Sequence, residues 1–261
     1  MKKMPVLFVG HGHPMNALDK NSPFNQNFRQ TTQTFEKPKA ILMISAHWYS
    51  SRLQVTSGEN PPMIYDFHGF PEELSQVQYP AQGSPELAEK VRSLLAPESV
   101  EMNPTRGFDH GAWTVLKYLY PDADVPVVQL SINRLQPAEW HFALAKKLAP
   151  LRDEGVLIIG SGNIVHNLRA ISWEHINQIG AGYDWAFAFR NEINQAIDAQ
   201  NDDLLVHYGQ LGENAELAVP TPDHYLPLLY VMALREPSDK VAFFNDELMA
   251  GSLSMTSVLI G

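Results

Sequence analysis

Three short apolar runs of this chain each end at a glycine or a small polar residue, and a histidine follows each run closely. The histidines are His11 after residues 6–9, His47 after residues 41–44, and His166 after the run that begins at residue 158. Apolar runs that stop in this way are typical of buried parallel strands. In open α/β sheets, ligands bind beyond the carboxyl ends of such strands. The pattern therefore predicts a parallel sheet with a histidine-rich site at one edge.

Strand-like and helix-like segments alternate along the rest of the chain. Ser84 and Pro85 indicate a helix start, because serine caps a first turn and proline fits the first helical position. Thr221 and Pro222 repeat this signal just before His224. The further expected strands are residues 125–130, 241–244 and 254–260, and the expected helices are residues 85–95, 136–148 (ended by Pro150), 183–199 and 222–234.

This alternation predicts an α/β fold, a single layered α/β/α sandwich around a mostly parallel or mixed central sheet. At 261 residues, the whole chain (residues 1–261) fits one domain. Residues 52–79 depart from the pattern, because they are rich in proline, glycine and aromatic residues. Long irregular insertions of this kind are often binding loops.

The charge balance narrows the class of partner. The chain has 19 Lys and Arg against 29 Asp and Glu, a formal net charge of -10. An acidic surface repels phosphate backbones and anionic lipids, so we expect neither nucleic acid nor membrane as a partner. No run approaches the roughly 18 apolar residues that span a bilayer, and the N-terminal apolar run is too short for a signal peptide. We therefore expect a cytoplasmic protein.

Histidine and carboxylate are the only strong metal ligands in this sequence. Cysteine is absent, which excludes disulfides, thiolate zinc sites and iron–sulfur clusters. His11, His47 and His224 together can form a three-histidine mononuclear site that leaves positions open for water, oxygen or substrate. Imidazole suits Fe(II), Zn(II) and Cu(II), and the sequence alone does not choose among these metals.

His166 has a different sequence setting from the other candidates. It follows the glycine-rich turn Gly160–Asn163, and we expect it in the first turn of a helix. A helix N-terminus disfavours imidazolium, so His166 should stay neutral. A neutral imidazole near the metal could serve as a fourth ligand or as a general base.

Two more histidines lie close to these motifs in the sequence. His110 follows Asp109, a candidate helix cap, and is either a group that binds substrate or an exposed neighbour of the cap. His13 comes two residues after His11 but is followed by Pro14, so we expect it to flank the site rather than to bind the metal.

An ordered set of short motifs covers essentially the whole chain. The motifs are Gly10-His11-Gly12-x-Pro14-Met15, Ser45-Ala46-His47-Trp48, Asp66-Phe67-x-Gly69-Phe70-Pro71, Gly107-Phe108-Asp109-His110-Gly111-x-Trp113, Ser161-Gly162-Asn163-x-Val165-His166-Asn167-Leu168, Pro220-Thr221-Pro222-x-His224-Tyr225-Leu226-Pro227 and Gly251-Ser252-Leu253-Ser254-Met255. Together they resemble the 4,5-DOPA extradiol dioxygenase family, within the class III (protocatechuate-type) extradiol ring-cleaving superfamily.

The resemblance implies an α/β fold with a non-haem Fe(II) site. Bacterial members of the family are also similar to zinc-bound forms. It implies that the metal ligands are His11, His47 and His224. It further implies that His166 is the acid/base beside the metal, close enough to ligate Zn(II), and that His110 faces the substrate or oxygen.

Two residues are expected to contact the substrate, His13 and Tyr225. In the resembling family a serine usually stands at the position of His13, which implies that this histidine lies at the rim of the site. The expected reaction is extradiol opening of a catechol such as L-DOPA with O2, by 4,5-cleavage to a semialdehyde, with His166 removing a proton from the catechol.

Two alternatives use the same residues. One is a zinc-dependent hydrolase in which the metal activates water, His11 and His13 form a paired ligand element, and Asp109 or Asp223 is the nearest carboxylate. The other is a non-catalytic protein that binds a metal or a small molecule. The sequence leaves open the physiological substrate, the native metal and the oligomeric state.

Overall fold

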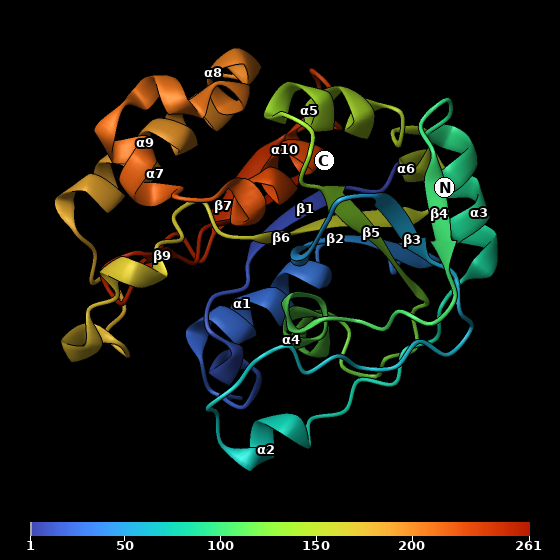
Figure 1. Cartoon of the computed structure of the whole chain (residues 1–261), viewed down its shortest axis with the longest axis horizontal. Helices are drawn as coiled ribbons and strands as arrows, with labels where there is room; N and C mark the ends of the chain where they lie inside the picture. The colour runs from blue at the N-terminus through green and yellow to red at the C-terminus, as the bar shows by residue number, and fades with distance from the viewer. Residues whose placement is uncertain (1) are drawn as a thin grey trace.

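The structure is a computed structural model that describes residues 2–261. Within these residues the centre is an eight-stranded mixed sheet with helices on both faces (Figure 1). The strands, in the order in which they lie side by side, are β4 (Val100–Asn103), β3 (Leu53–Thr56), β5 (Val127–Asn133), β2 (Ala40–Ser50), β6 (Val156–Gly162), β1 (Val6–Gly10), β10 (Ser257–Ile260) and β7 (Val241–Phe244). The predicted α/β/α sandwich with a mixed central sheet is confirmed.

The two faces of the sheet bury two separate apolar cores. Along β1, Leu7 and Val9 point into one core, and Val6 and Phe8 into the other, as the two-residue period of a strand requires. The first core packs against α1 (Pro23–Thr32), α2 (Glu72–Ser75) and α4 (His110–Leu119). The second packs against α3 (Pro85–Leu94), α5 (Ala138–Lys146), α6 (Pro150–Asp153), α7 (Asp184–Asp198), α8 (Asp202–Val206), α9 (Glu213–Ala218) and α10 (Leu226–Met232).

The central strands β5, β2, β6 and β1 are parallel, so their carboxyl ends meet at one edge. Gly10 of β1 pairs with Gly162 of β6, and Ser45 of β2 pairs with Ser161. This register brings the residues that follow β1 and β6 beside the last part of β2. The predicted histidine-bearing edge therefore exists.

Two helices begin at the capping residues that the sequence indicates. The Ser84 side chain accepts a hydrogen bond from the backbone N–H of Leu87 at 3.2 Å and caps α3. Asp109 accepts one from the N–H of Ala112 at 3.2 Å and caps α4. Because each cap satisfies a backbone donor that the helix leaves free, the helix begins at that point.

Two expected helices have different bounds from those predicted. Pro150 does not end α5 but begins α6, where its missing N–H is not needed. The helix expected over residues 222–234 is divided into a 3-10 turn, Pro222–His224, and α10. Pro227 has no N–H to continue the ladder of the preceding turn, so the chain starts a new helix there.

The expected C-terminal strand is also divided. Residues 254–260 contain the end of β9 (Leu253–Ser254), which pairs with β8 (Leu248–Met249), and the whole of β10. Along residues 2–261, no helix combines the length and the apolar character that crossing a bilayer requires.

Gly162 joins the sheet to the turn that carries His224. A Cβ atom at Gly162 would lie 2.1 Å from the carbonyl oxygen of His224. The same oxygen accepts a hydrogen bond from the N–H of Asn163 at 2.9 Å. The absence of a side chain at Gly162 therefore allows the close approach that places His224 at the end of β6.

Gly162→Ala should lower the free energy of unfolding by about 1–3 kcal/mol, because the turn that carries His224 must move to accommodate the methyl group. Urea denaturation of the metal-free protein measures this change. Gly209→Ala is the matched control, since a Cβ there would have nothing within 4 Å. Equal stability of the two variants would contradict the close-packing explanation.

Candidate metal centre

Six histidines line one cavity of about 410 Å³ at the carboxyl edge of the parallel strands, and five of them, all but His13, come from separate segments. His11 follows β1, His47 lies within β2, His110 begins α4, His166 follows β6, and His224 ends the 3-10 turn before α10. The cavity thus gathers side chains from five segments that are far apart in the sequence. All five were expected at the site from the sequence.

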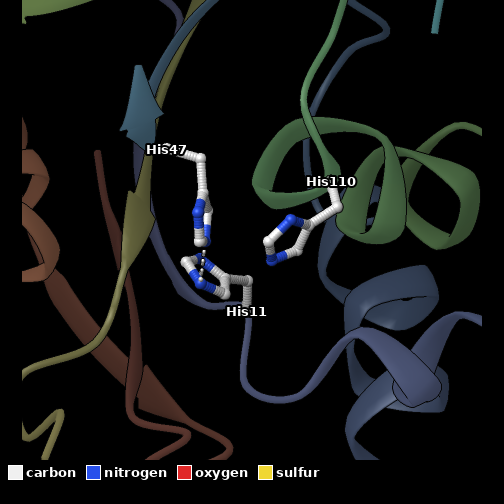
Figure 2. Close-up of side chains that lie close together, drawn as sticks. All are labelled: His11, His47 and His110. Carbon is white, nitrogen blue, oxygen red and sulfur yellow. Dashed lines mark hydrogen bonds between the residues drawn. The ribbon is translucent and has the colours of Figure 1, made fainter. Parts of the chain in front are cut away.

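The rings of His11, His47 and His110 form the tightest group. His11 Nε2 and His47 Nε2 are 3.2 Å apart, and the ring centroids of His47 and His110 are 3.8 Å apart. Each of the three offers a nitrogen within 4.8 Å of the others. Figure 2 shows the rings turned toward one another from the end of β1, from β2 and from the start of α4.

His224 lies beside this group. Its ring centroid is 5.2 Å from that of His11 and 5.0 Å from that of His47. His11 and His47 are therefore common to two possible three-histidine sets, one with His110 and one with His224. The expected set was the second.

The hydrogen bonds of His11 define which of its nitrogens is free. Ser161 Oγ donates its single hydrogen to the carbonyl oxygen of Gly111 at 2.6 Å. The contact of 3.0 Å between His11 Nδ1 and Ser161 Oγ must therefore have the histidine N–H as donor. In the neutral ring, Nε2 then carries the lone pair, and it faces His47.

A carboxylate holds the Nδ1 side of two other rings. Asp223 accepts a hydrogen bond from His224 Nδ1, and Asp66 accepts one from His110 Nδ1 at 2.9 Å. Carboxylates that accept from Nδ1 orient metal-binding histidines and leave Nε2 as the ligand atom. His224 Nε2 is fully buried and has no hydrogen-bond partner among residues 2–261.

These observations fit a bound metal ion. A buried nitrogen without a partner is costly unless a ligand completes it, and His224 Nε2 is such an atom. Two nitrogens bound to one ion at about 2.0–2.1 Å lie about 2.8–3.4 Å apart, from adjacent positions of an octahedron to those of a tetrahedron. The separation of 3.2 Å between the Nε2 atoms of His11 and His47 matches this spacing.

A buried hydrogen-bond network fixes the start of α4 against β2. Asp109 is fully buried, and it accepts hydrogen bonds from Ser45 Oγ at 2.6 Å and from Gln129 Nε2. Ser45 Oγ also accepts from the N–H of His47 at 3.2 Å. Since Asp109 caps α4, its contact with Ser45 sets His110 against His47. The carboxylate of Asp109 is thus used in support of the site and does not line the cavity.

Burial keeps the central rings neutral. It lowers the pKa of His11 well below the usual value, and the neighbouring His47 lowers it further. Burial and the nearby His110 have the same effect on the pKa of His47. Neutral imidazoles retain the lone pair that binds a metal.

The structural setting predicted for His166 is wrong. The residue lies in no helix: it forms an isolated bridge with Leu253, and its N–H donates to the carbonyl of Ala218 at 2.8 Å. Its ring stacks on that of His224, with centroids 3.4 Å apart and planes 4° apart. Burial, followed by the effect of His224, lowers the pKa of His166 to about 3. The prediction that the His166 ring is neutral is thus correct, but the cause is the burial of the ring and not a helix N-terminus.

The two residues expected to contact substrate have different positions. His13 lines the cavity, packs edge-on against Phe70 with centroids 5.0 Å apart, and accepts a hydrogen bond at Nδ1 from the N–H of Met15. Tyr225 lies outside the cavity. It is fully buried, and its hydroxyl donates to the carbonyl of Leu205 at 3.0 Å. The expectation that Tyr225 binds substrate is therefore wrong, because its side chain points into the core.

Residue-by-residue reasoning did not single out Asp66 or the apolar wall of the cavity. Asp66, Phe67 and Phe70 come from the irregular segment 52–79, which the sequence marked only as a binding loop. The sequence signal for these three residues was the motif Asp66-Phe67-x-Gly69-Phe70-Pro71, which is one of those that carry the family resemblance. The remaining apolar lining residues come from the segment after His166 and from β9: Leu168, Ile171, Trp173, Ile176 and Leu253.

This chain is similar to known proteins along nearly its whole length. Residues 5–225 match the family described as the catalytic LigB subunit of aromatic ring-opening dioxygenase. The chain is 44% identical to the 4,5-DOPA dioxygenase extradiol of Escherichia coli (strain K12), over 99% of this chain and 95% of that protein. It is 38% identical to the protein of the same name from Beta vulgaris, over 97% of this chain and 94% of that one.

A solved structure agrees with this similarity. The crystal structure of an uncharacterized protein from Escherichia coli K12 superposes with a TM-score of 0.86 at 42% identity, and the match covers 99% of this chain and 100% of that one. At this identity the likeness concerns the sequence as well as the fold.

The carboxylate of Asp66 makes stability depend on pH. Burial alone would raise its pKa, but the hydrogen bonds and charge of His110 outweigh burial and lower the pKa to about 2. A depressed carboxyl pKa stabilises the fold above the unfolded pKa of about 3.9, and this stabilisation is lost as the pH falls toward 2.

Asp66→Asn should therefore lower the free energy of unfolding of the metal-free protein at pH 6 by about 1–2 kcal/mol, after allowance for solvent screening. The difference from wild type should shrink as the pH falls from 5 toward 3, which urea denaturation at each pH measures. Asp124→Asn, at an exposed ion pair with Lys37, is the control and should change stability little. A difference that does not vary with pH would exclude the charge of Asp66 as its cause.

Proposed function

The chain belongs to the extradiol family of aromatic ring-opening dioxygenases, and we propose that it opens a catechol such as L-DOPA with O2, by 4,5-cleavage to a semialdehyde. One observation carries the proposal: the convergence of histidine ring nitrogens at the carboxyl edge of the sheet, beside a cavity that can hold an aromatic ring. The names of the full-length relatives support the substrate class.

We propose His11, His47 and His224 as the ligands of a single Fe(II). His11 Nδ1 donates to Ser161 and His224 Nδ1 donates to Asp223, so each leaves Nε2 for the ion. Fe(II) supplies the electron density that O2 needs in order to react with a closed-shell catechol, which redox-inert Zn(II) does not supply. The same nitrogens also suit Zn(II), which we expect to bind without supporting ring opening.

His166 is the proposed acid/base. Its ring is neutral, half-buried and stacked on the ring of His224, so it lies beside the proposed ligands and can accept a proton from a catechol hydroxyl. His110 is the proposed contact to the substrate or oxygen. Asp66 holds its Nδ1, which fixes the ring and leaves Nε2 for the cavity.

A zinc hydrolase finds less support from the same geometry. It requires His11 and His13 as paired ligands, but His13 Nδ1 accepts from Met15 and its ring packs against Phe70. It also requires a carboxylate free to activate water. Asp66 and Asp223 each accept from a histidine, and Asp109 is enclosed by Ser45 and Gln129.

Reconstitution with metal tests the proposed reaction. Metal-stripped protein loaded anaerobically with Fe(II) should consume O2 with L-DOPA and give a yellow semialdehyde, whereas Zn(II)-loaded protein should not. Oxygen uptake and absorbance measure the reaction, and metal analysis measures the loading. Stoichiometric Fe(II) without oxygen uptake for any catechol would overturn the proposed function.

His166→Ala separates metal binding from proton transfer. The variant should retain stoichiometric metal but lose about 10²–10⁴-fold in kcat, the usual contribution of a general base. His47→Ala should instead lose the metal, and His175→Ala, outside the cavity, should resemble wild type. Unchanged turnover of His166→Ala would remove its assigned role, as would loss of its metal together with its activity.

A further inference from the structure

A second, smaller cavity adjoins the cavity that the histidines line. It measures about 200 Å³. Four residues border both spaces and so form the wall between them: Gly12, His13, Ile176 and Leu253. The reaction proposed above gives this second cavity no role.

The second cavity is lined mainly by apolar side chains. Among residues 2–261, no lysine, arginine, aspartate or glutamate borders it. Methionine thioethers form part of the lining, and their polarisable sulfur atoms make favourable dispersion contacts with small apolar molecules. The apolar lining residues are Met15, Ile176, Met249, Ala250, Leu253 and Met255.

Two polar side chains of the lining are already bonded to other protein groups. His13 Nδ1 accepts a hydrogen bond from the N–H of Met15 at 3.3 Å, and Asn16 Nδ2 donates to the carbonyl oxygen of His11 at 3.4 Å. A buried water needs about two to four polar partners, whereas an apolar cavity of roughly 150 Å³ stays dry and binds xenon. The size and lining of the second cavity therefore suit a small apolar gas.

The second cavity lies directly beside the proposed metal centre. A Cβ atom at Gly12 would lie 2.4 Å from Met255 Sδ, so this thioether packs on the residue that follows His11. Leu253 is buried, and its backbone forms a bridge with His166. The wall between the cavities is therefore attached to a proposed ligand and to the proposed acid/base.

The second cavity also reaches the protein surface. Asn177 of its lining is exposed, whereas Leu253 and Met255 are buried. A path along apolar side chains thus leads from solvent to the wall beside the histidines. This path remains available when a catechol fills the larger cavity.

We propose that the second cavity binds O2 and admits it to the histidine centre while a catechol occupies the larger cavity. The inference rests on the proposed function, since it takes O2 as a reactant and the catechol oxygens to point toward the histidines. O2 is small, uncharged and apolar, so it loses little hydration on entry. A catechol anion or a carboxylate would lose water there without gaining a charged partner.

Xenon tests the cavity without turnover. Crystals of the metal-free protein under xenon pressure should show xenon beside Met249 and Met255. Met249→Trp fills this space and should remove the xenon. Met102→Trp makes the same change at another half-buried strand residue, outside both cavities, and should retain it. Absence of xenon from the second cavity of the unmodified protein would overturn the proposal.

Oxygen kinetics test the path. In Fe(II)-loaded Met249→Trp, kcat/KM for O2 should fall by about tenfold, because the entry of O2 is slowed. The Kd of L-DOPA, measured calorimetrically with Zn(II)-loaded protein, should stay at the wild-type value, and Met102→Trp should leave both quantities unchanged. Met249→Phe should give a smaller decrease, and it serves in place of Met249→Trp if the tryptophan prevents folding.

The outcomes separate this proposal from the proposed function. Oxygen uptake by the unmodified protein, with an unchanged kcat/KM for O2 in both Met249 variants, would overturn the oxygen path and leave the dioxygenase function intact. Weaker binding of L-DOPA with an unchanged kcat/KM for O2 would also overturn it, since the second cavity would then hold part of the catechol. Absence of oxygen uptake by the unmodified Fe(II)-loaded protein would overturn the function and the path together.

Discussion

The parallel pairing of β6 with both β1 and β2 is the constraint on which the rest of the structure depends. It sets Gly10 beside Gly162 and Ser45 beside Ser161, so β1 and β6 end at the same level, next to the part of β2 that carries His47. Because Gly162 lacks a side chain, the backbone of His224 can approach the sheet there. A register shift of one residue would turn the side chains of a strand to the opposite face. The metal-binding arrangement therefore depends on the same backbone hydrogen bonds that hold the sheet together.

The helix layer is attached to this edge by small polar groups. Ser161 donates to the carbonyl of Gly111, and Ser45 donates to Asp109, the cap of α4. A Cβ at Gly111 would lie 2.5 Å from Ser45 Oγ and 2.8 Å from Cδ2 of His47, so glycine permits the contact. Hydrogen bonds within a buried network strengthen one another, and here Asp109 is paired with Ser45 and with Nε2 of Gln129. The position of His110 relative to His47 is thus fixed by hydrogen bonds between buried residues and not by packing alone.

Much of this arrangement can be predicted from the sequence, because its signals are local. Apolar runs that end at a glycine or a small polar residue define β1, β2 and β6, and Ser84 and Asp109 cap the helices they were expected to cap. The errors arise where tertiary contacts override a local signal. His166 follows a glycine-rich turn that resembles a helix start, but its backbone pairs with Leu253, nearly ninety residues later. The apolar walls could not be predicted side chain by side chain, because irregular loops have no periodicity from which side-chain direction follows.

The placement of charge explains how the histidine cluster can bind a cation. Asp66 and Asp223 accept hydrogen bonds on the Nδ1 side of His110 and His224, so their oxygens orient the rings. Burial lowers the pKa of His11 and His47 well below the usual value, which leaves lone pairs available at neutral pH without repulsion between charged rings. The proposed ligand atoms therefore come from the sheet edge, whereas most of the apolar wall of the cavity comes from two loops. A substitution in either loop can therefore change the wall of the cavity without disturbing the strand register that gathers the histidines.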